Sequence, residues 1–144
     1  MKKLIVTIVS ILFFSALIFA GGPPKEVKAA FKQKFPHAEK VKWEKEKKDG
    51  TEWEASFTVK AATFSANFSE DGAWLKTEQV ITASKLPKPV TKAIQKDYAG
   101  YKITEAEKVE TEENALKYEV KIKSKKEEKE LVYDENGVVV AEEE

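Results

Sequence analysis

The side chains that could carry out catalysis are few in this chain and are not grouped. His37 is the only histidine, and its Phe-Pro-His-Ala context is typical of an exposed turn. The sequence has no cysteine, so it offers no thiolate nucleophile and no cysteine-ligated metal site. It also lacks a Gly-rich phosphate loop, a Gly-x-Ser-x-Gly elbow and a His-Glu-x-x-His motif. We therefore predict a protein that is not an enzyme and binds no cofactor or metal.

Carboxylates are abundant, but their spacing does not fit a metal loop. Asp134-Glu135-Asn136-Gly137 is similar to the start of a calcium loop, yet the twelve-residue ligand spacing is absent and a Val-rich segment follows. A hairpin turn is the expected structure there. Lys and Glu interleave over residues 117–128, which is typical of a solvated sheet face with weak cross-strand ion pairs.

The overall charge excludes a further class of function. Lysine and arginine together number 25, all of them lysine, and they balance 25 acidic residues to give a formal net charge of zero. Proteins that bind nucleic acid usually have a basic surplus and use arginine for bidentate contacts. We predict that this protein does not bind nucleic acid.

The N-terminal segment predicts export from the cytoplasm. Lys2 and Lys3 precede 17 uncharged residues, and Gly21-Gly22-Pro23-Pro24 follows. This order is typical of a signal peptide over residues 1–20 with cleavage between Ala20 and Gly21. The alternative is an uncleaved anchor, since 17 residues is the short end of a membrane span. Cleavage would leave a periplasmic or secreted bacterial protein with no stable membrane span.

The rest of the chain shows an internal similarity. Residues 24–35 align with residues 87–98, and residues 53–57 align with residues 118–122. In the first segment the apolar residues have the spacing of a helix, and the apolar residues after it alternate with polar ones as in antiparallel strands. The predicted fold class is therefore α+β, a tandem repeat of a helix plus a four-stranded antiparallel meander, with the helices packed on one face of the sheet.

The predicted domain boundaries follow from this repeat. Repeat 1 spans residues 21–76 and repeat 2 spans residues 87–144, with a packed connector over residues 77–86. The connector contains Val80, Ile81 and Leu86 instead of a flexible Gly/Ser run. We expect the two meanders to form one continuous sheet, or two sheets docked edge to edge, and to unfold as one cooperative unit.

Several motifs together resemble the PepSY-like family of secreted bacterial proteins, which are described as β-lactamase-inhibitor-like. The resemblance covers nearly all of residues 23–141. The motifs are Phe35-Pro36, Val41-Lys42-Trp43-Glu44-Lys45, residues 53–57, residues 68–75, Leu86-Pro87 with Val90, and Tyr98-Ala99-Gly100-Tyr101. Ala99 departs from the family, which often has proline there. The resemblance implies a helix-plus-meander fold and an inhibitory or binding role, and it implies no catalytic residues.

The sheet face that points away from the helices is the candidate binding surface. In the first repeat this face carries short polar side chains, whereas in the second it carries many Lys and Glu. The candidate partner-binding residues are Glu52, Glu54, Ser56, Thr58, Thr63, Ser65 and Asn67, together with Trp43 and Trp74. We expect a non-enzymatic module that docks an extracytoplasmic protein or peptide. The alternatives are a structural or envelope-stress protein without a protein ligand, and a small-ligand-binding protein. The sequence does not define the oligomeric state.

Overall fold

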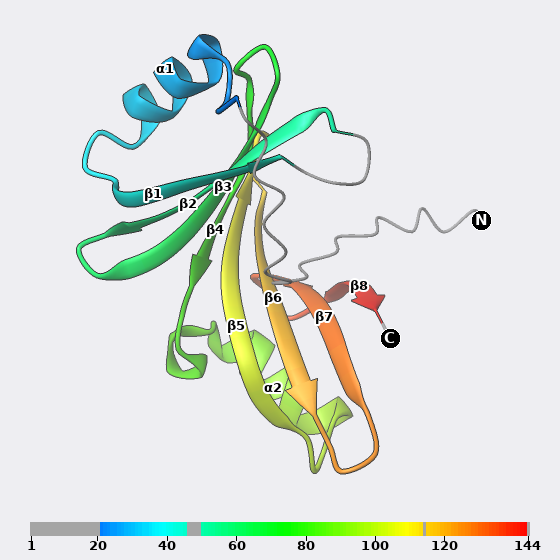
Figure 1. Ribbon diagram of the computed structural model, residues 1–144. Helices are drawn as coiled ribbons and strands as arrows, with labels where there is room; N and C mark the ends of the chain where they lie inside the picture. Colours follow the sequence, from blue (N-terminus) through cyan, green and yellow to red (C-terminus); the bar gives the residue numbers. More distant parts are fainter. Residues whose placement is uncertain (1–20, 46–49, 114, 144) are drawn as a thin grey trace. The chain divides into compact units, whose positions relative to one another are not determined.

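The computed structural model describes residues 21–45, 50–113 and 115–143 (Figure 1). The predicted signal peptide over residues 1–20, including Ala20 of its cleavage site, lies outside the described residues. The described part contains helices α1 (Lys25–Lys34) and α2 (Lys88–Asp97) and a short 3₁₀ turn, η1 (Ala83–Lys85). Its strands are β1 (Glu39–Lys45), β2 (Glu52–Val59), β3 (Ala62–Ser69), β4 (Trp74–Val80), β5 (Lys102–Thr111), β6 (Leu116–Lys123), β7 (Glu128–Asp134) and β8 (Val139–Glu143).

The sheet corrects the predicted fold class. The structure is mainly one eight-stranded antiparallel sheet in the order β1-β2-β3-β4-β5-β6-β7-β8, with only two helices in the described part. The predicted α+β tandem repeat of a helix plus a four-stranded meander is therefore wrong. Alternation of polar and apolar residues identifies single strands, but it does not show where a sheet ends. The similar strand patterns of the two halves therefore suggested two separate meanders. In the structure the eight strands instead follow one another in a single sheet.

The chain forms two compact units. Among the described residues, those up to Val80 together with Val109–Ala115 form the N-terminal unit, and Ile81–Lys108 with those from Leu116 onward form the C-terminal unit. The predicted connector over residues 77–86 contains the end of β4, the turn η1 and the buried residue Leu86. The prediction that the two parts unfold cooperatively stays a prediction.

The core of the N-terminal unit lies between α1 and one face of the strands. Val27 and Phe31, one helical turn apart, are the buried residues of α1. The ring of Phe31 lies 5.0 Å from that of Phe57 and 6.1 Å from that of Phe68, both in edge-to-face geometry. Pro24 immediately precedes the helix, and Phe35 is its C-cap. Since proline disfavours the helical conformation in the residue before it, Pro36 accounts for the end of α1 after Lys34.

The core of the C-terminal unit is built in the same way around α2. Val90 and Ile94 are the buried residues of α2. They belong to a cluster with apolar residues of β6 and β7 and with Leu86. The buried strand residues of this cluster are Ala106, Tyr118, Val120, Ile122, Leu131 and Tyr133.

In each unit a glycine in a hairpin turn contacts the start of the helix. Gly72 has a φ of +91°, and a Cβ atom there would lie 3.0 Å from the carbonyl oxygen of Glu26. Gly137 has a φ of +82°, and its Cβ atom would lie 2.6 Å from the carbonyl oxygen of Pro89. The Asp134 carboxylate accepts hydrogen bonds from the backbone of Asn136 at 2.9 Å and of Val138 at 2.8 Å. This segment is thus the predicted hairpin turn.

Candidate functional site

One face of the N-terminal unit carries mainly polar side chains, and the strand register explains why. Glu44 lies opposite Glu54, Glu54 lies opposite Asn67, and Asn67 lies opposite Lys76. Directly paired residues of an antiparallel sheet point to the same face, so these side chains form one row across four strands. We call this surface the polar face. Its members are Glu39, Lys42, Glu44, Glu52, Glu54, Ser56, Thr58, Thr63, Ser65, Asn67, Ser69, Lys76 and Glu78.

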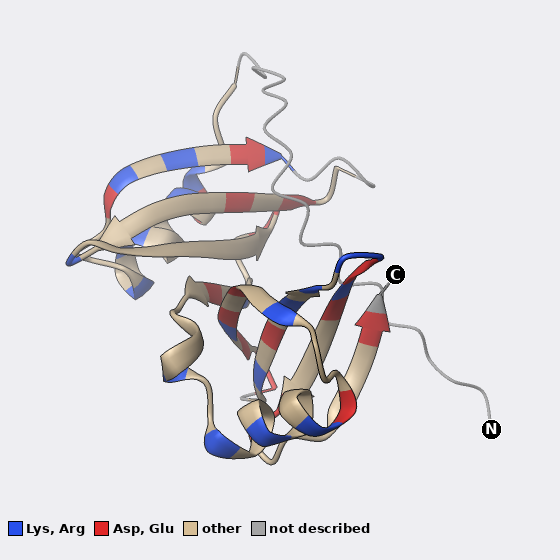
Figure 2. Cartoon of the chain, turned by 90° about the horizontal axis from the view of Figure 1, so that it is seen from below, with Lys and Arg blue, Asp and Glu red and all other residues tan. Residues whose placement is uncertain are grey.

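The opposite face belongs to α1 and the core. Ala55, Phe57, Ala66 and Phe68 point to that side and are buried. Figure 2 shows how closely Lys and Glu follow one another along β1, the edge strand of this unit. The polar face and the core are therefore on opposite sides of the same strands.

The structure brings seven of the nine predicted site residues together and places two elsewhere. Ser56 lies opposite Ser65, and Thr58 lies opposite Thr63, on the polar face. The ring of Trp43 instead lies 5.1 Å from that of Phe31, on the helix side. Trp74 is also on the helix side, with the ammonium nitrogen of Lys34 3.6 Å from its ring centroid.

The positions of the two tryptophans have different explanations. Trp43 alternates with Lys42 and Glu44, so its spacing already predicts the core side. For Trp74 the spacing misleads, because the register between β3 and β4 shifts between Asn67 and Phe68. This irregularity pairs Trp74 with Phe68, and its indole nitrogen donates a hydrogen bond to the Thr77 hydroxyl at 2.9 Å.

Glu78 is a member of the polar face that sequence reasoning missed. It is only 8% exposed, and its carboxylate accepts hydrogen bonds from the Ser65 hydroxyl at 2.8 Å and from the Lys76 ammonium at 2.7 Å. A buried carboxylate needs such partners because desolvation is otherwise costly. The alternation of Lys76 and Glu78 along one strand was the available signal for this ion pair.

Asn67 is also buried, although it was expected on an approachable surface. It is 1% exposed, and its amide nitrogen lies 3.5 Å from a carboxylate oxygen of Glu52. Its side-chain oxygen has no hydrogen-bond partner among the described residues. Asn67 is thus buried within the polar face, while Glu44 and Thr63 remain exposed.

A second candidate site is a pocket of about 420 Å³ in the C-terminal unit, between the end of α2 and the start of β5. Its walls include Ile94, Ile103, Tyr98 and Tyr101, with Thr91 and Gln95 at the helix side. The two tyrosine rings lie 5.7 Å apart in edge-to-face geometry. The Tyr101 hydroxyl donates a hydrogen bond to the carboxylate of Glu127, which raises the pKa of this phenol.

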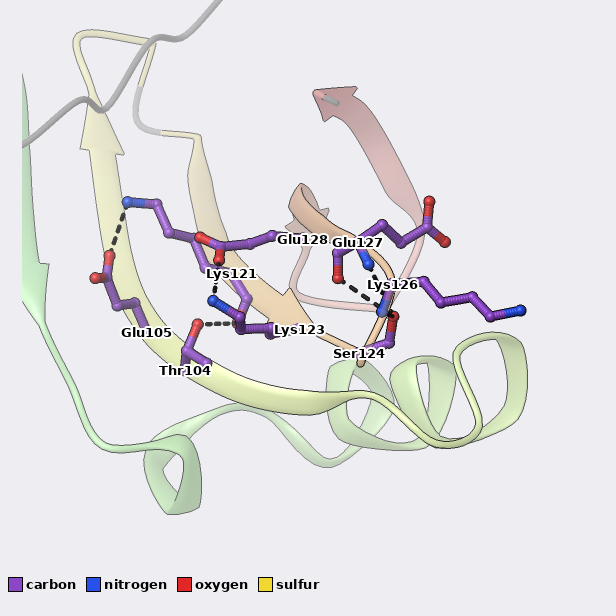
Figure 3. A network of polar contacts seen from close by, with 8 residues as sticks. All are labelled: Thr104, Glu105, Lys121, Lys123, Ser124, Lys126, Glu127 and Glu128. Carbon is purple, nitrogen blue, oxygen red and sulfur yellow. Dashed lines mark hydrogen bonds and ion pairs between the residues drawn. The ribbon is translucent and has the colours of Figure 1, made fainter.

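The charged strands of the C-terminal unit form ion pairs (Figure 3). Lys121 contacts Glu105 at 2.8 Å, and Lys123 contacts Glu128 at 3.1 Å. Hydrogen bonding to Glu105 is the main cause of a raised pKa at Lys121. Next to these pairs, the Ser124 hydroxyl accepts hydrogen bonds at 3.2 Å from the backbone of Lys126 and of Glu127, which fixes the β6–β7 turn. The interleaved Lys and Glu thus form cross-strand ion pairs, as predicted.

His37 is exposed in the turn after α1. Within either unit taken by itself, the described residues hold no group of three acidic or histidine side chains close enough to ligate one ion. No helix in the described part has the length and apolarity needed to cross a membrane.

The profile of one protein family matches residues 51–141, most of the strands described above. Its description is "Putative beta-lactamase-inhibitor-like, PepSY-like". The chain belongs to this PepSY-like family. The match confirms the resemblance predicted from the sequence motifs. A search of curated proteins found no match.

Solved structures share the PepSY-like fold. A DUF2874 family protein from Bacteroides ovatus is 22% identical, with a TM-score of 0.77 over 85% of this chain and 88% of its own. A BLIP-like protein from Bacteroides fragilis is 22% identical, with a TM-score of 0.74 over 84% and 85% of the two chains. A protein from Bacteroides eggerthii, 17% identical, has a TM-score of 0.77 over 85% and 89%. Its description as one of the "putative periplasmic proteins" agrees with the predicted periplasmic or secreted location.

Proposed function

We propose that this PepSY-like protein is a non-enzymatic binding module of the periplasm or cell exterior that docks a protein or peptide on its polar face. The main support is that seven predicted residues from β2 and β3 lie on one face, opposite the face that packs on α1. The inhibitor-like description of the family supports a protein as the ligand.

The physical properties of this face suit docking. A sheet braced by a helix on its other side is rigid, so little conformational entropy is lost when a partner binds. Ser56, Thr58, Thr63 and Ser65 have short side chains with few rotamers, and their hydroxyls both donate and accept hydrogen bonds. A polar protein surface or an extended peptide is the complement of such a face.

Site-specific photo-crosslinking in the producing cell tests this function. A photoreactive residue at Ser56 or Thr63 reports the polar face, and one at Gln33 reports the exposed side of α1 as a matched control. We expect a discrete protein adduct from the first two positions and none from Gln33. Absence of adducts, or the same adducts from all three positions, would contradict the proposal.

The pocket beside Tyr98 and Tyr101 favours small-ligand binding as a second candidate function. Its volume of about 420 Å³ falls within the size range of small-molecule sites. Trp43, Trp53 and Trp74 all belong to the N-terminal unit, so tryptophan fluorescence would not report this site. Ligand-observed NMR with small aromatic and sugar probes is the suitable assay, and Tyr101→Ala should abolish any saturable signal. Signals unchanged by Tyr101→Ala would exclude this pocket as the site.

A further inference from the structure

We infer that the solvent-facing side of α2 binds a membrane surface that carries anionic phosphate headgroups. Three lysines of α2, Lys88, Lys92 and Lys96, form this site, and we call them the lysine row. The inference goes beyond the proposed docking function, because it concerns the helix of the C-terminal unit and not the polar face of the N-terminal unit. Its support comes from helical spacing, from exposure and from the distribution of charge.

Helical spacing places the lysine row on one side of α2, away from the core. The three lysines follow one another at every fourth residue, so they span about 12 Å along the helix axis. The buried residues of α2, Val90 and Ile94, lie two positions from the nearest lysines, which is about 200° around the axis. All three lysines are exposed, and Figure 2 shows their blue segments recurring along α2. The lysine row is thus a straight line of cations that faces solvent.

No carboxylate of the described residues neutralises the lysine row. None of its three ammonium groups forms a hydrogen bond or an ion pair within the part of the chain that the structure describes. Asp97 is the only acidic residue of α2, and it lies about 100° around the axis from Lys96. Residues 81–96 contain four lysines and no acidic residue, so positive charge is concentrated in this segment although the whole chain has a formal net charge of zero.

This arrangement weakens α2 itself. Like charges four residues apart on a helix repel each other and are destabilising. Lys88 also lies in the first turn, where the helix dipole favours an anion, and α2 has no acidic residue in that turn. In α1, by contrast, Glu26 lies in the first turn and contacts Lys25 at 3.9 Å. Since nothing within the described part of the chain offsets the repulsion in α2, an anion outside the chain is the expected partner.

The chemistry of the lysine row favours lipid headgroups over an acidic protein. The cores of protein interfaces are poor in lysine and rich in aromatic residues and arginine, and α2 contains neither of the latter two. An ammonium group on a flexible stem donates three hydrogen bonds and adapts to phosphates in a fluid layer. The large apolar residues of α2 are buried, so the contact is electrostatic and stays at the level of the headgroups.

Cosedimentation of the processed protein, which begins at Gly21, with lipid vesicles tests this inference. We expect saturable binding to vesicles of equal parts phosphatidylglycerol and phosphatidylcholine, and none to phosphatidylcholine alone. Binding should be lost in about 1 M salt, where the Debye length falls to about 3 Å. Equal binding to both kinds of vesicle would overturn the inference, and so would no binding to either, the result expected if the lysine row binds an acidic protein. Displacement by glycerol phosphate at the same concentration as the headgroups would indicate a site for free phosphate and would also overturn it.

Variants then locate the site. Lys88→Gln/Lys92→Gln should weaken binding to the anionic vesicles at least about tenfold, because each lysine near a charged membrane contributes about fivefold. Lys88→Arg/Lys92→Arg keeps both charges and should bind as the parent does. Lys117→Gln/Lys123→Gln is the matched control for net charge: both lysines are three residues from Val120, which faces the α2 core, so they point to the other side of β6. Equal losses in the two glutamine variants, or no loss from Lys88→Gln/Lys92→Gln, would overturn the assignment to α2.

Discussion

At the scale of single residues, the hydroxyl of Tyr133 gives a prediction for alkaline pH. Tyr133 is fully buried, and its hydroxyl has no hydrogen-bond partner among the described residues. The pKa of this phenol is raised from 10.0 to about 12, mainly by burial and to a smaller extent by nearby negative groups. The folded state therefore keeps the proton more tightly than the unfolded chain does. The stability that this difference contributes is fully present below pH 10. The free energy of unfolding should fall as the pH rises from 10 to about 12, because the unfolded chain loses the proton first.

The variant Tyr133→Phe should remove much of that loss, measured as the free energy of unfolding in urea at several pH values. At pH 7 it should change stability by less than about 1 kcal/mol, because the lost hydroxyl makes no hydrogen bond. A loss of stability at pH 7 well above that value would show that the Tyr133 hydroxyl has a partner after all.

Gly137 gives the second prediction at this scale. A side chain there would place its Cβ atom 2.6 Å from the backbone of α2, and the φ of +82° is unfavourable for any residue but glycine. Gly137→Ala should lower the free energy of unfolding by more than about 2 kcal/mol through steric overlap and backbone strain. Gly100→Ala is the matched control, because Gly100 has a φ of +90° but open space around its Cβ position. Equal losses for the two variants would show that strain alone is responsible.

At the scale of elements, the β2–β3 hairpin has a turn that its sequence does not favour. Val59 pairs with Ala62, so Lys60 and Ala61 form a two-residue loop, and their φ angles are +48° and +67°. This geometry normally selects Asn-Gly. Lys60→Asn/Ala61→Gly should therefore raise the free energy of unfolding by about 1 kcal/mol. A lower midpoint in urea would show that the native Lys-Ala turn is stabilised by contacts beyond its backbone.

The elements also show which features of the fold could be predicted from the sequence. Helix α1 lies within the segment where the apolar spacing predicts a helix, between Pro24 and Pro36, because this spacing and the effect of proline on the backbone are both local. The strands follow the predicted alternation for the same reason. The burial of Asn67 and Glu78 was not predicted, since it depends on side chains from neighbouring strands. The irregular register that turns Trp74 toward the helix could likewise not be predicted, because alternation within one strand carries no information about the pairing between strands.

At the scale of the whole molecule, the path of the chain predicts cooperative unfolding. The chain passes between the two units three times, after Val80, after Lys108 and after Ala115, so neither unit is a continuous segment. We predict a single transition in urea, with coincident curves from tryptophan fluorescence, which reports the N-terminal unit, and from far-ultraviolet circular dichroism, which reports both. Two separate midpoints would show that the units unfold independently.

Ile81→Asp extends this test to a single position at the boundary between the units. Ile81 packs against the core of the C-terminal unit, and its backbone donates a hydrogen bond to Ala106 at 2.9 Å. A carboxylate there should lower the free energy of unfolding by about 2 kcal/mol, because it loses water and gains no partner. The midpoint of the urea transition should shift by the same amount in tryptophan fluorescence and in circular dichroism. A variant as stable as the parent would contradict the prediction.

The central claim, docking on the polar face, is tested most directly by the affinity of the protein partner identified by crosslinking. Glu54→Arg/Thr63→Arg places two long cations on this face, and Ala29→Arg/Gln33→Arg places the same two cations on the exposed side of α1. Isothermal titration calorimetry with the purified partner should give at least about a tenfold weaker Kd for the first variant, as expected when repulsive and steric contacts enter the centre of an interface. The α1 variant should bind as the parent does. Unchanged affinity of Glu54→Arg/Thr63→Arg, or equal losses in both variants, would contradict the claim.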